Sequence, residues 1–334
     1  MKAVVTGGAG FIGSHLVDRL VGEGLDVLAV DDLSTGRAEN LAHLRGNPHV
    51  RFVQADVADE DALAAVVDGV DWVFHLAGLA DIVPSIERPL AYHRANVDGT
   101  VAVLEAARRA GVRRFVYAAS SSCYGIPDEY PTPESAPLRP EYPYALTKLL
   151  GEAYAIHWAR VYGLPVVSLR LFNVYGPRSR TSGAYGAVFG VFLAQKIHHR
   201  PLTVVGDGSQ SRDFTFVSDV VEAFLAAARS DVSGEILNVG TGQPVTVNRL
   251  AELIGGEVEY IPKRPREPER TQADIGRIRR VLGWTPKVAI EEGVAVLLQH
   301  MDAWRDAPVW TPETIASATR EWFRFLGKVE APGR

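Results

Sequence analysis

Tyr144 and Lys148 are the two residues whose types and spacing point most directly to chemistry. Pro143 stands just before them and no helix breaker follows until Gly151, so we expect a helix over residues 143–163. Positions i and i+4 of a helix share one face, and an ammonium beside a phenol favours the phenolate. We therefore expect the pKa of Tyr144 to lie below its usual ~10, so that it can take a proton from a hydroxyl group. The same spacing also arises in helices that carry only a half-buried tyrosine beside a surface lysine.

A run of hydroxyl groups precedes this pair, at Ser120-Ser-Ser-Cys-Tyr-Gly125. It follows a predicted strand over residues 113–119, and serines in that place are commonly turn residues. The loop from the run to Tyr144 is rich in proline and can fold back across the edge of a sheet. We expect Ser120 and Ser122 to reach the same cleft as Tyr144.

A glycine-rich turn follows the first β-branched run, Lys2–Thr6, which reads as a buried strand. Gly7, Gly10 and Gly13 have the spacing of a dinucleotide-binding turn, and an amphipathic helix is expected over residues 14–22. Because glycine has no Cβ, the backbone there can turn tightly and approach a pyrophosphate. The N–H groups at the start of the helix would face the phosphates. A turn of this kind between a strand and a helix predicts a dinucleotide site.

Two acidic residues, Asp31 and Asp32, end a second predicted strand over residues 26–30. A carboxylate about 20 positions after such glycines accepts hydrogen bonds from the adenosine ribose diol and repels a 2′-phosphate. The sequence therefore predicts NAD rather than NADP, although the nearby Arg37 would suit a 2′-phosphate. The plainer alternative is that Asp31 is a solvated turn residue.

The first half of the chain alternates short apolar runs with amphipathic segments, which predicts strands and helices in turn. His75-Leu-Ala-Gly78 stands at the carboxyl end of one such run, where ligands bind in open parallel sheets. We predict an α/β fold with a Rossmann-type, doubly wound parallel sheet. Its further strands are expected at residues 51–54, 71–75, 113–119 and 165–171, and its further helices at 59–68, 89–110 and 143–163.

The second half has a different character, because glycine and proline become frequent and the predicted elements become short. A strand and turn are expected at Val204–Ser211, a helix that ends near Arg229, and a strand at Glu235–Val239. We therefore expect a smaller mixed α/β substrate lobe. The expected division is a Rossmann domain of residues 1–172 with 214–232, a substrate lobe of residues 173–213 and 233–305, and a C-terminal helical tail of residues 306–334.

Composition limits the classes of protein to consider. The 334 residues are 47% hydrophobic and 22% charged, with a formal net charge of −5, so we expect a globular protein that does not bind nucleic acid. Cys123 is the one cysteine, which fits a reducing compartment. A strand is expected from residue 2 and no apolar run is long enough to cross a bilayer. We expect a cytoplasmic protein without a membrane partner or a metal site.

Taken together, these motifs resemble the extended short-chain dehydrogenase/reductase family, and within it the nucleotide-sugar epimerases of the UDP-hexose 4-epimerase group. The resemblance covers residues 1 to about 305. It rests on Thr6-Gly-Gly-Ala-Gly-Phe-Ile-Gly13, Asp31, Asp56, Ala77-Gly78, Asn96, Ala119-Ser-Ser-Ser-Cys-Tyr-Gly125, Tyr144-x-x-x-Lys148, Arg170-Leu-Phe-Asn-Val-Tyr-Gly-Pro177, Gly206-Asp-Gly-Ser-Gln-Ser-Arg-Asp213 and Asn238-Val-Gly-x-Gly242.

The resemblance implies a bound NAD that takes part in catalysis and is regenerated in each turnover. Tyr144 would take the proton from the sugar 4-hydroxyl while the C4 hydride passes to the nicotinamide and later returns to the other face of the 4-keto sugar. Lys148 would hold the nicotinamide ribose, and Ser120, helped by Ser122, would bond O4. The implied cofactor-binding residues are Gly7, Gly10, Phe11, Ile12, Gly13, Asp31, Asp32, Asp56, Val57, Leu76, Ala77, Gly78, Asn96, Tyr144 and Lys148.

The implied substrate is a UDP-sugar, and the implied assembly is a homodimer. Arg212 and Arg264 would grip the pyrophosphate, and Ala187 and Val188 would lie near the base. The implied substrate-binding residues are Ser85, Ser120, Asn173, Ala187, Val188, Arg212, Arg264, Glu267 and Thr271.

The serine run separates this chain from sister enzymes that share the first oxidation step. In the resembled family, 4,6-dehydratases carry an Asp-Glu pair in this stretch and UDP-glucuronate decarboxylases a glutamate. Here the positions read Ser120-Ser-Ser-Cys123, so no carboxylate is present to expel the C6 hydroxyl, which favours epimerisation. Cys123 lies one residue closer to Tyr144 than the acid/base cysteine of 3,5-epimerases, so we expect a buried structural thiol.

Thr271 stands at the position that gates the space around the C2 substituent in the resembled 4-epimerases. A tyrosine there restricts the pocket to plain hexoses, so threonine predicts activity on UDP-glucose and UDP-galactose and on their 2-acetamido forms. The Ala119–Ser122 run and Gly183-Ala-Tyr185 also resemble the N-acetylhexosamine enzymes. The plainer alternative is that Thr271 caps a helix that starts near Ala273.

Two other functions stay open on the sequence. Arg178 and Arg180 lie in a polar loop that is either solvated or anion-facing, and they would suit a uronate carboxylate, which would make UDP-glucuronate the substrate. A non-enzymatic dinucleotide sensor of the same fold is the second alternative. Such sensors usually lack the tyrosine–lysine pair that this chain retains.

The chain departs from the resembled pattern in two places. Asp81 follows the His75–Gly78 stretch, where a hexose 4-epimerase often has a lysine near the nicotinamide. Residues 311–326 add a helix beyond the usual end, with Thr311 as N-cap, Pro312 as its first residue and Glu313 in the first turn. Its apolar side chains would cover the core or a partner; they are Ile315, Trp322, Phe323 and Leu326.

Overall fold

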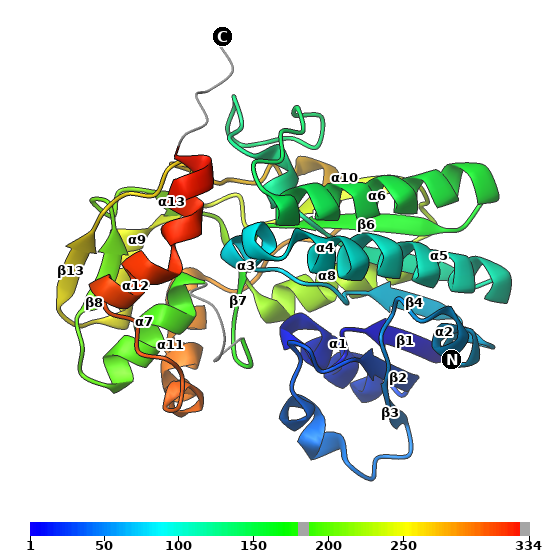
Figure 1. Cartoon of the computed structure of the whole chain (residues 1–334). Helices are drawn as coiled ribbons and strands as arrows, with labels where there is room; N and C mark the ends of the chain where they lie inside the picture. The colour runs from blue at the N-terminus through cyan, green and yellow to red at the C-terminus, as the bar shows by residue number, and fades with distance from the viewer. Residues whose placement is uncertain (180–186, 328–334) are drawn as a thin grey trace.

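The computed structural model describes residues 1–179 and 187–327. Its central element is a parallel sheet of seven strands in the order β3-β2-β1-β4-β5-β6-β11, which confirms the predicted Rossmann-type fold (Figure 1). The order reverses between β1 and β4, and ligands bind at such a point in doubly wound folds. The strands are β1 Lys2–Thr6, β2 Asp26–Asp31, β3 Val50–Gln54, β4 Trp72–His75, β5 Arg114–Ser120, β6 Val166–Leu171 and β11 Glu235–Val239.

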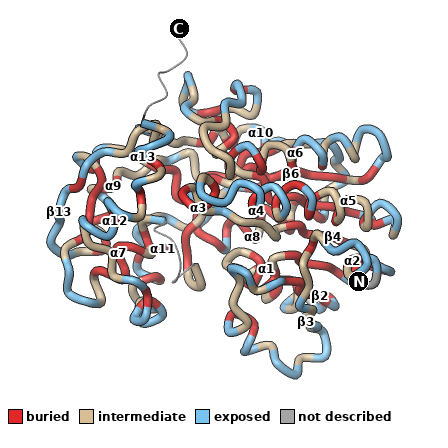
Figure 2. The backbone as a smooth tube through the Cα atoms, in the orientation of Figure 1, coloured by how far each residue is buried: buried red, intermediate tan, exposed pale blue. Residues whose placement is uncertain are grey.

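Helices cover both faces of this sheet, and its inner strands are largely buried between them (Figure 2). One buried core joins the sheet to α1 and α8 through side chains such as Leu16 and Phe224. The other joins it to α2, α5 and α6 through side chains such as Leu63 and Leu104. The helices are α1 Phe11–Gly22, α2 Glu60–Val67, α5 Gly99–Ala110, α6 Pro143–Tyr162 and α8 Val217–Arg229.

Two of these helical segments differ from the expectation. α1 begins at Phe11, three residues earlier than expected, because the glycine turn itself supplies its first turn and Gly10 is the N-cap. The helix expected over residues 89–110 is divided into α4 Pro89–His93, a π-helical turn Arg94–Asp98 and α5. A π turn inside a helix often marks a functional site.

The smaller lobe has its own core, which packs Phe192, Val204, Leu250, Leu297 and Trp304 together. β11, which we expected in this lobe, is instead the edge strand of the large sheet beside β6, and the division into domains stays a proposal. The lobe contains the strand pairs β7 Asn173–Tyr175 with β10 Phe214–Phe216, β8 Leu202–Val205 with β13 Val258–Ile261, and β9 Ser211–Arg212 with β12 Val245–Thr246, and the helices α7 Val188–Ile197, α9 Val247–Ile254 and α11 Ile290–Gln299.

The C-terminal tail forms two short helices, α12 Pro312–Ala318 and α13 Arg320–Leu326, rather than the single helix expected. Thr319 interrupts the run, since it is the C-cap of α12 and its hydroxyl donates to the carbonyl of Ile315. The start is as predicted: the Thr311 side chain accepts a hydrogen bond from the Thr314 N–H. α13 contacts α3 Ile82–Glu87 at the edge of the large lobe (Figure 1).

The remaining described helices are short. They are η1 Ala38–Leu44, η3 Ser121–Tyr124, α10 Gly276–Leu282 and η4 Met301–Trp304. Within residues 1–179 and 187–327, no helix combines the length and the apolar character that a bilayer span requires.

Candidate functional site

A cavity of about 690 Å³ opens at the carboxyl ends of the central strands and is lined by residues of both lobes. All the predicted site residues line it except Ser85 and Asn96. Ser85 is fully buried in α3, where its hydroxyl donates to the carbonyl of Ile82. The cavity therefore brings together the glycine turn, the serine run, the tyrosine–lysine pair and the arginines.

The glycine turn leaves no room for side chains. Gly7 has a φ of +69°, and a Cβ on Gly13 would lie 2.0 Å from the Gly7 carbonyl oxygen. A Cβ on Gly7 would lie 2.8 Å from the backbone nitrogen of Ala77 on the neighbouring loop. No described side chain caps the first turn of α1, so its N–H groups are available to a phosphate. The turn fits the pyrophosphate of a dinucleotide.

Asp31 is held at the end of β2 with its carboxylate at the cavity. It is 6% exposed, so the alternative of a solvated turn residue is wrong. Its Oδ2 accepts from the Ala9 N–H at 3.0 Å and its Oδ1 from the Leu33 N–H at 2.9 Å, while burial raises its pKa. The Gly10 N–H also bonds to this carboxylate, which has about four acceptor sites, so it can still accept from a ribose hydroxyl.

The prediction that Lys148 lowers the pKa of Tyr144 is wrong for this structure. The pKa of Tyr144 is raised above its ordinary value, because burial disfavours the phenolate and the negative charge of Asp81 disfavours it further. A hydrogen bond with the Ser120 side chain acts in the opposite direction. The Lys148 ammonium lies instead 4.5 Å from the centre of the Tyr117 ring.

Lys148 is 7% exposed, and burial lowers its pKa to about 8, with the charge of Glu152 opposing that shift. The ammonium is therefore costly to hold in this site and would gain from an oxygen-rich ligand. Its place in the cavity fits the expected contact with a ribose.

The serine run forms η3 directly after β5, and the hydroxyl groups of Ser120 and Ser122 lie 2.9 Å apart. Ser120 is the N-cap of this turn and accepts from the Ser122 N–H, so the turn role and the cavity role coexist. Cys123 is 2% exposed, and burial raises the pKa of its thiol to about 12. This confirms the prediction of a buried cysteine.

Asn96 does not line the cavity but supports segments that do. It lies in the π turn, 1% exposed, and its amide pairs with the backbone N–H and C=O of Leu79 at 2.7 and 3.0 Å. It also donates to the Thr147 hydroxyl at 2.9 Å. Asn96 thus ties the loop after β4 to α6, the helix that carries Tyr144.

His75 is also a buried structural residue. Its ring nitrogens lie 2.7 Å from the Thr6 hydroxyl and 3.0 Å from the Thr100 hydroxyl. Burial lowers its pKa to about 3, so the ring is neutral, and it joins β1, β4 and α5 beneath the cavity floor.

The opposite end of the cavity is cationic. Arg212 Nη2 lies 2.9 Å from Glu267 Oε1, and Arg264 Nη1 lies 3.7 Å from Glu267 Oε2. One carboxylate therefore draws two arginines from different segments to the same place. Two guanidinium groups so arranged suit a diphosphate.

Thr271 lines the cavity beside Asn173. Its hydroxyl accepts from the Asp213 N–H and donates to Asn173 Oδ1, both at 3.1 Å. It caps no helix, because α10 begins only at Gly276, so that alternative is wrong.

Arg178 is paired with Asp18 of α1 at 2.7 Å. The features expected at Arg180 and at Gly183-Ala-Tyr185 fall outside the described residues.

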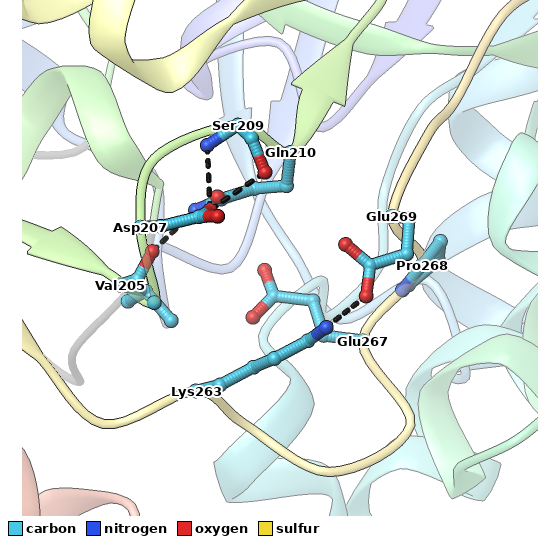
Figure 3. Close-up of a pocket in the computed structure, with 9 residues that line it drawn as sticks. Val205, Asp207, Ser209, Gln210, Lys263, Glu267, Pro268 and Glu269 are labelled. Atoms are coloured by element: carbon cyan, nitrogen blue, oxygen red, sulfur yellow. Dashed lines mark hydrogen bonds and ion pairs between the residues drawn. The ribbon is translucent and has the colours of Figure 1, made fainter.

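Several lining residues were not predicted. Tyr142, Val205, Gln210 and Trp322 line the cavity, and the last belongs to the tail. A smaller recess of about 250 Å³ adjoins it (Figure 3), and both are lined by Val205, Gln210, Glu267 and Pro268. In the sequence, Tyr142 adjoins the tyrosine–lysine stretch, but the others carry no local signal because distant segments bring them in.

Comparison with known proteins agrees with this site. The sequence matches the NAD dependent epimerase/dehydratase family over residues 3–240. It is 41% identical over 303 residues to the UDP-glucose 4-epimerase of Mycolicibacterium smegmatis, covering 88% of this chain and 96% of that protein.

Two solved structures share the fold over most of the chain. The UDP-glucose 4-epimerase of Thermotoga maritima, solved with UDP-glucose, is 35% identical with a TM-score of 0.85, covering 91% of this chain and 99% of that one. The UDP-N-acetylglucosamine 4-epimerase of Methanobrevibacter ruminantium, in complex with UDP-N-acetylmuramic acid, is 33% identical with a TM-score of 0.84, covering 90% and 98%. By sequence and by fold, this chain is an NAD-dependent enzyme of the NAD dependent epimerase/dehydratase family.

Proposed function

We propose that the enzyme inverts C4 of a UDP-sugar through a transient 4-keto sugar. The observation that carries this proposal is the pairing of Tyr144 with Ser120 in a cavity whose serine run contains no carboxylate. The likeness to a UDP-glucose 4-epimerase over 88% of the chain supports it. Loss of water or carbon dioxide would need an acid that this stretch lacks.

The residues that would hold NAD are the glycine turn, Asp31 and Lys148, and bound NAD supplies a reversible hydride acceptor. Tyr144 takes the proton of the 4-hydroxyl as general base and returns it after the sugar has turned over. Ser120 donates to O4 and orients it. Arg212 and Arg264 anchor the diphosphate, so the hexose alone is free to rotate between its two faces.

The sugar range follows from the space around Thr271. We propose activity on UDP-glucose and UDP-galactose and on their 2-acetamido forms, and the resemblance to a UDP-N-acetylglucosamine 4-epimerase supports the wider range. UDP-glucuronate is the less favoured candidate, because Arg178 is already paired with Asp18.

A single substitution tests this range. Thr271→Tyr should abolish turnover of the 2-acetamido sugars and spare the plain hexoses, because added bulk clashes only with the larger C2 group. Thr271→Ser keeps the hydroxyl and serves as the control. Equal loss on both kinds of substrate would show that Thr271 is not the gate.

Product analysis tests the reaction itself. Each UDP-sugar is incubated with the purified enzyme without added cofactor, and the product is examined by mass and by proton NMR of C4. We expect unchanged mass with inverted C4, and a loss of roughly 10²–10⁴ in rate for Tyr144→Phe. A product lighter by water or carbon dioxide would refute the proposal. NADP rather than NAD released on denaturation would refute the cofactor role of Asp31.

We also propose a homodimer. α6 exposes Leu146, Tyr154 and Val161, whose exposed fractions are 46%, 40% and 52%, along one side of the helix. A second copy that packs its own α6 there would cover them. Sedimentation of the wild type should give a dimer and the Tyr154→Glu/Val161→Glu variant a monomer. A wild-type monomer would contradict this.

A further inference from the structure

The tail helix α13 reaches the cavity through one side chain, Trp322. This indole is 4% exposed, and its Nε1 donates to the Pro265 carbonyl at 2.8 Å. The Arg264 guanidinium lies over the same ring at 5.6 Å from its centre. Trp322 therefore holds both the backbone and the cation of the segment that contributes to the diphosphate end of the cavity.

Trp322 is also connected to Tyr144 through the ring of Tyr142. The rings of Trp322 and Tyr142 are 6.4 Å apart, and those of Tyr142 and Tyr144 are 6.3 Å apart and nearly parallel at 9°. All three aromatic residues line the cavity together with Arg264. The indole of Trp322 thus contacts Arg264 on one side and Tyr142, which stacks on Tyr144, on the other.

Core packing alone does not account for this placement. Ile315 of α12 is buried in the core of the smaller lobe, whereas Phe323 and Phe325 of α13 are 41% and 48% exposed. The tail is therefore already anchored by α12, and α13 buries only the indole that faces the cavity. The segment it holds has no regular secondary structure between β13 and α10 and contains Arg266 at a φ of +57°.

We propose that Trp322 is a substrate-positioning residue that fixes Arg264 toward the diphosphate and forms a wall against the hexose. This inference rests on the proposed function, because it needs a sugar diphosphate in the cavity. An indole holds a guanidinium by a cation–π contact with the face of the group, whereas phosphate oxygens are recognised by its N–H edges. α13 lies outside the family match, which ends at residue 240. A sugar-site residue thus comes from the tail.

Binding measurements and kinetics test the proposal. Trp322→Ala should weaken binding of UDP and of UDP-glucose by roughly tenfold, since a misplaced Arg264 loses about one charged contact. KM should rise by a similar factor while kcat changes much less, because Tyr144 and Ser120 stay in place. Phe323→Ala, next to it on the same helix but exposed, is the matched control. Content of bound NAD reports that each variant is folded.

Tryptophan fluorescence distinguishes a residue that contacts the ligand from one that only supports the fold. UDP binding should quench the tryptophan emission of the wild type, and Trp322→Phe should lose that quenching while it keeps most of the affinity. Equal affinities for Trp322→Ala and Phe323→Ala would overturn the proposal. If Trp322→Ala fails to fold, a Trp322→Phe variant whose emission is quenched by UDP as in the wild type overturns it. A wild type that binds no UDP-sugar, by calorimetry, overturns both this inference and the proposed function.

Discussion

At the scale of single residues, the surroundings of Tyr144 favour its protonated form. Burial raises its pKa, and the charge of Asp81 adds to the effect. Because only the phenolate accepts a proton, activity should rise with pH across the neutral range. Asp81 stands where the resembled enzymes often have a lysine, so the sign of the charge beside the base is reversed.

Removing that charge should make the base work at lower pH. Asp81→Asn should lower the pKa of Tyr144 and move the acid limb of the kcat/KM profile to lower pH, with higher activity at about pH 6 than the wild type. The measurement is a pH–rate profile from about pH 6 to about pH 9. Asp98→Asn, at an exposed carboxylate of the same lobe, is the control. An acid limb that stays in place would show that Asp81 does not act on Tyr144.

The glycine turn gives a second prediction at this scale. Gly13→Ala places a Cβ 2.0 Å from the Gly7 carbonyl oxygen, so the turn must open, at a cost of about 1–3 kcal/mol. The variant should purify with much less NAD, as measured by absorbance after denaturation. Gly22→Ala, in the last turn of the same helix, meets no described atom within 4 Å and should keep its NAD. Equal NAD in both variants would mean that the turn does not approach the cofactor.

At the scale of elements, α6 is positioned by a buried ion pair. Arg170 of β6 and Glu152 of α6 are 2% and 3% exposed, and Arg170 Nη2 donates to Glu152 Oε1 at 2.6 Å. Arg170 also donates to the Tyr124 hydroxyl at 2.8 Å, and Tyr124 donates to Asn238 Oδ1 at 2.7 Å. The network joins the helix that carries Tyr144 to three neighbouring segments.

Breaking the ion pair between Arg170 and Glu152 should mainly lower the free energy of unfolding. Glu152→Ala leaves the Arg170 charge buried without its carboxylate, a change worth about 3–5 kcal/mol in the free energy of unfolding. Glu105→Ala removes two ion pairs, with Arg108 and Arg109, from the surface of α5 and should cost much less stability. Urea unfolding followed by circular dichroism compares the two. Similar losses for both variants would contradict a special role for the buried pair.

The sequence predicted the strands and helices better than it predicted the places where a helix is interrupted. The parallel strands and α6 follow from apolar runs and from Pro143, which are local signals. The π turn around Asn96 does not, because it depends on hydrogen bonds to Leu79 and Thr147, far away in the chain. β11 reads like any short strand, and its place in the large sheet depends on pairing with β6. For the same reason the sequence placed Tyr144 and Asp31 in the site but not Trp322.

At the scale of the whole molecule, the two lobes have separate cores and share one cavity. Leu16 and Phe224 belong to the core beneath the glycine turn, whereas Phe192 and Trp304 belong to the core of the smaller lobe. Ile12 packs against both, at the start of α1. Because the glycine turn and Asp31 lie on the larger lobe, binding of NAD should require only that lobe, whereas binding of a UDP-sugar should require both lobes.

A cavity made in the smaller core should therefore separate the two ligands. Trp304 is fully buried there, and Trp304→Ala should cost about 3–5 kcal/mol and loosen the lobe that carries Arg212 and Arg264. We expect the variant to keep its NAD and to lose affinity for UDP. NAD content after denaturation and UDP calorimetry measure the two properties on one preparation. Trp304→Phe is the matched control: it keeps an aromatic ring and loses only a nitrogen that has no hydrogen-bond partner within the described part of the chain and part of the ring volume, so it should cost clearly less than Trp304→Ala. NAD lost in parallel with UDP binding would show that the two cores unfold as one cooperative unit.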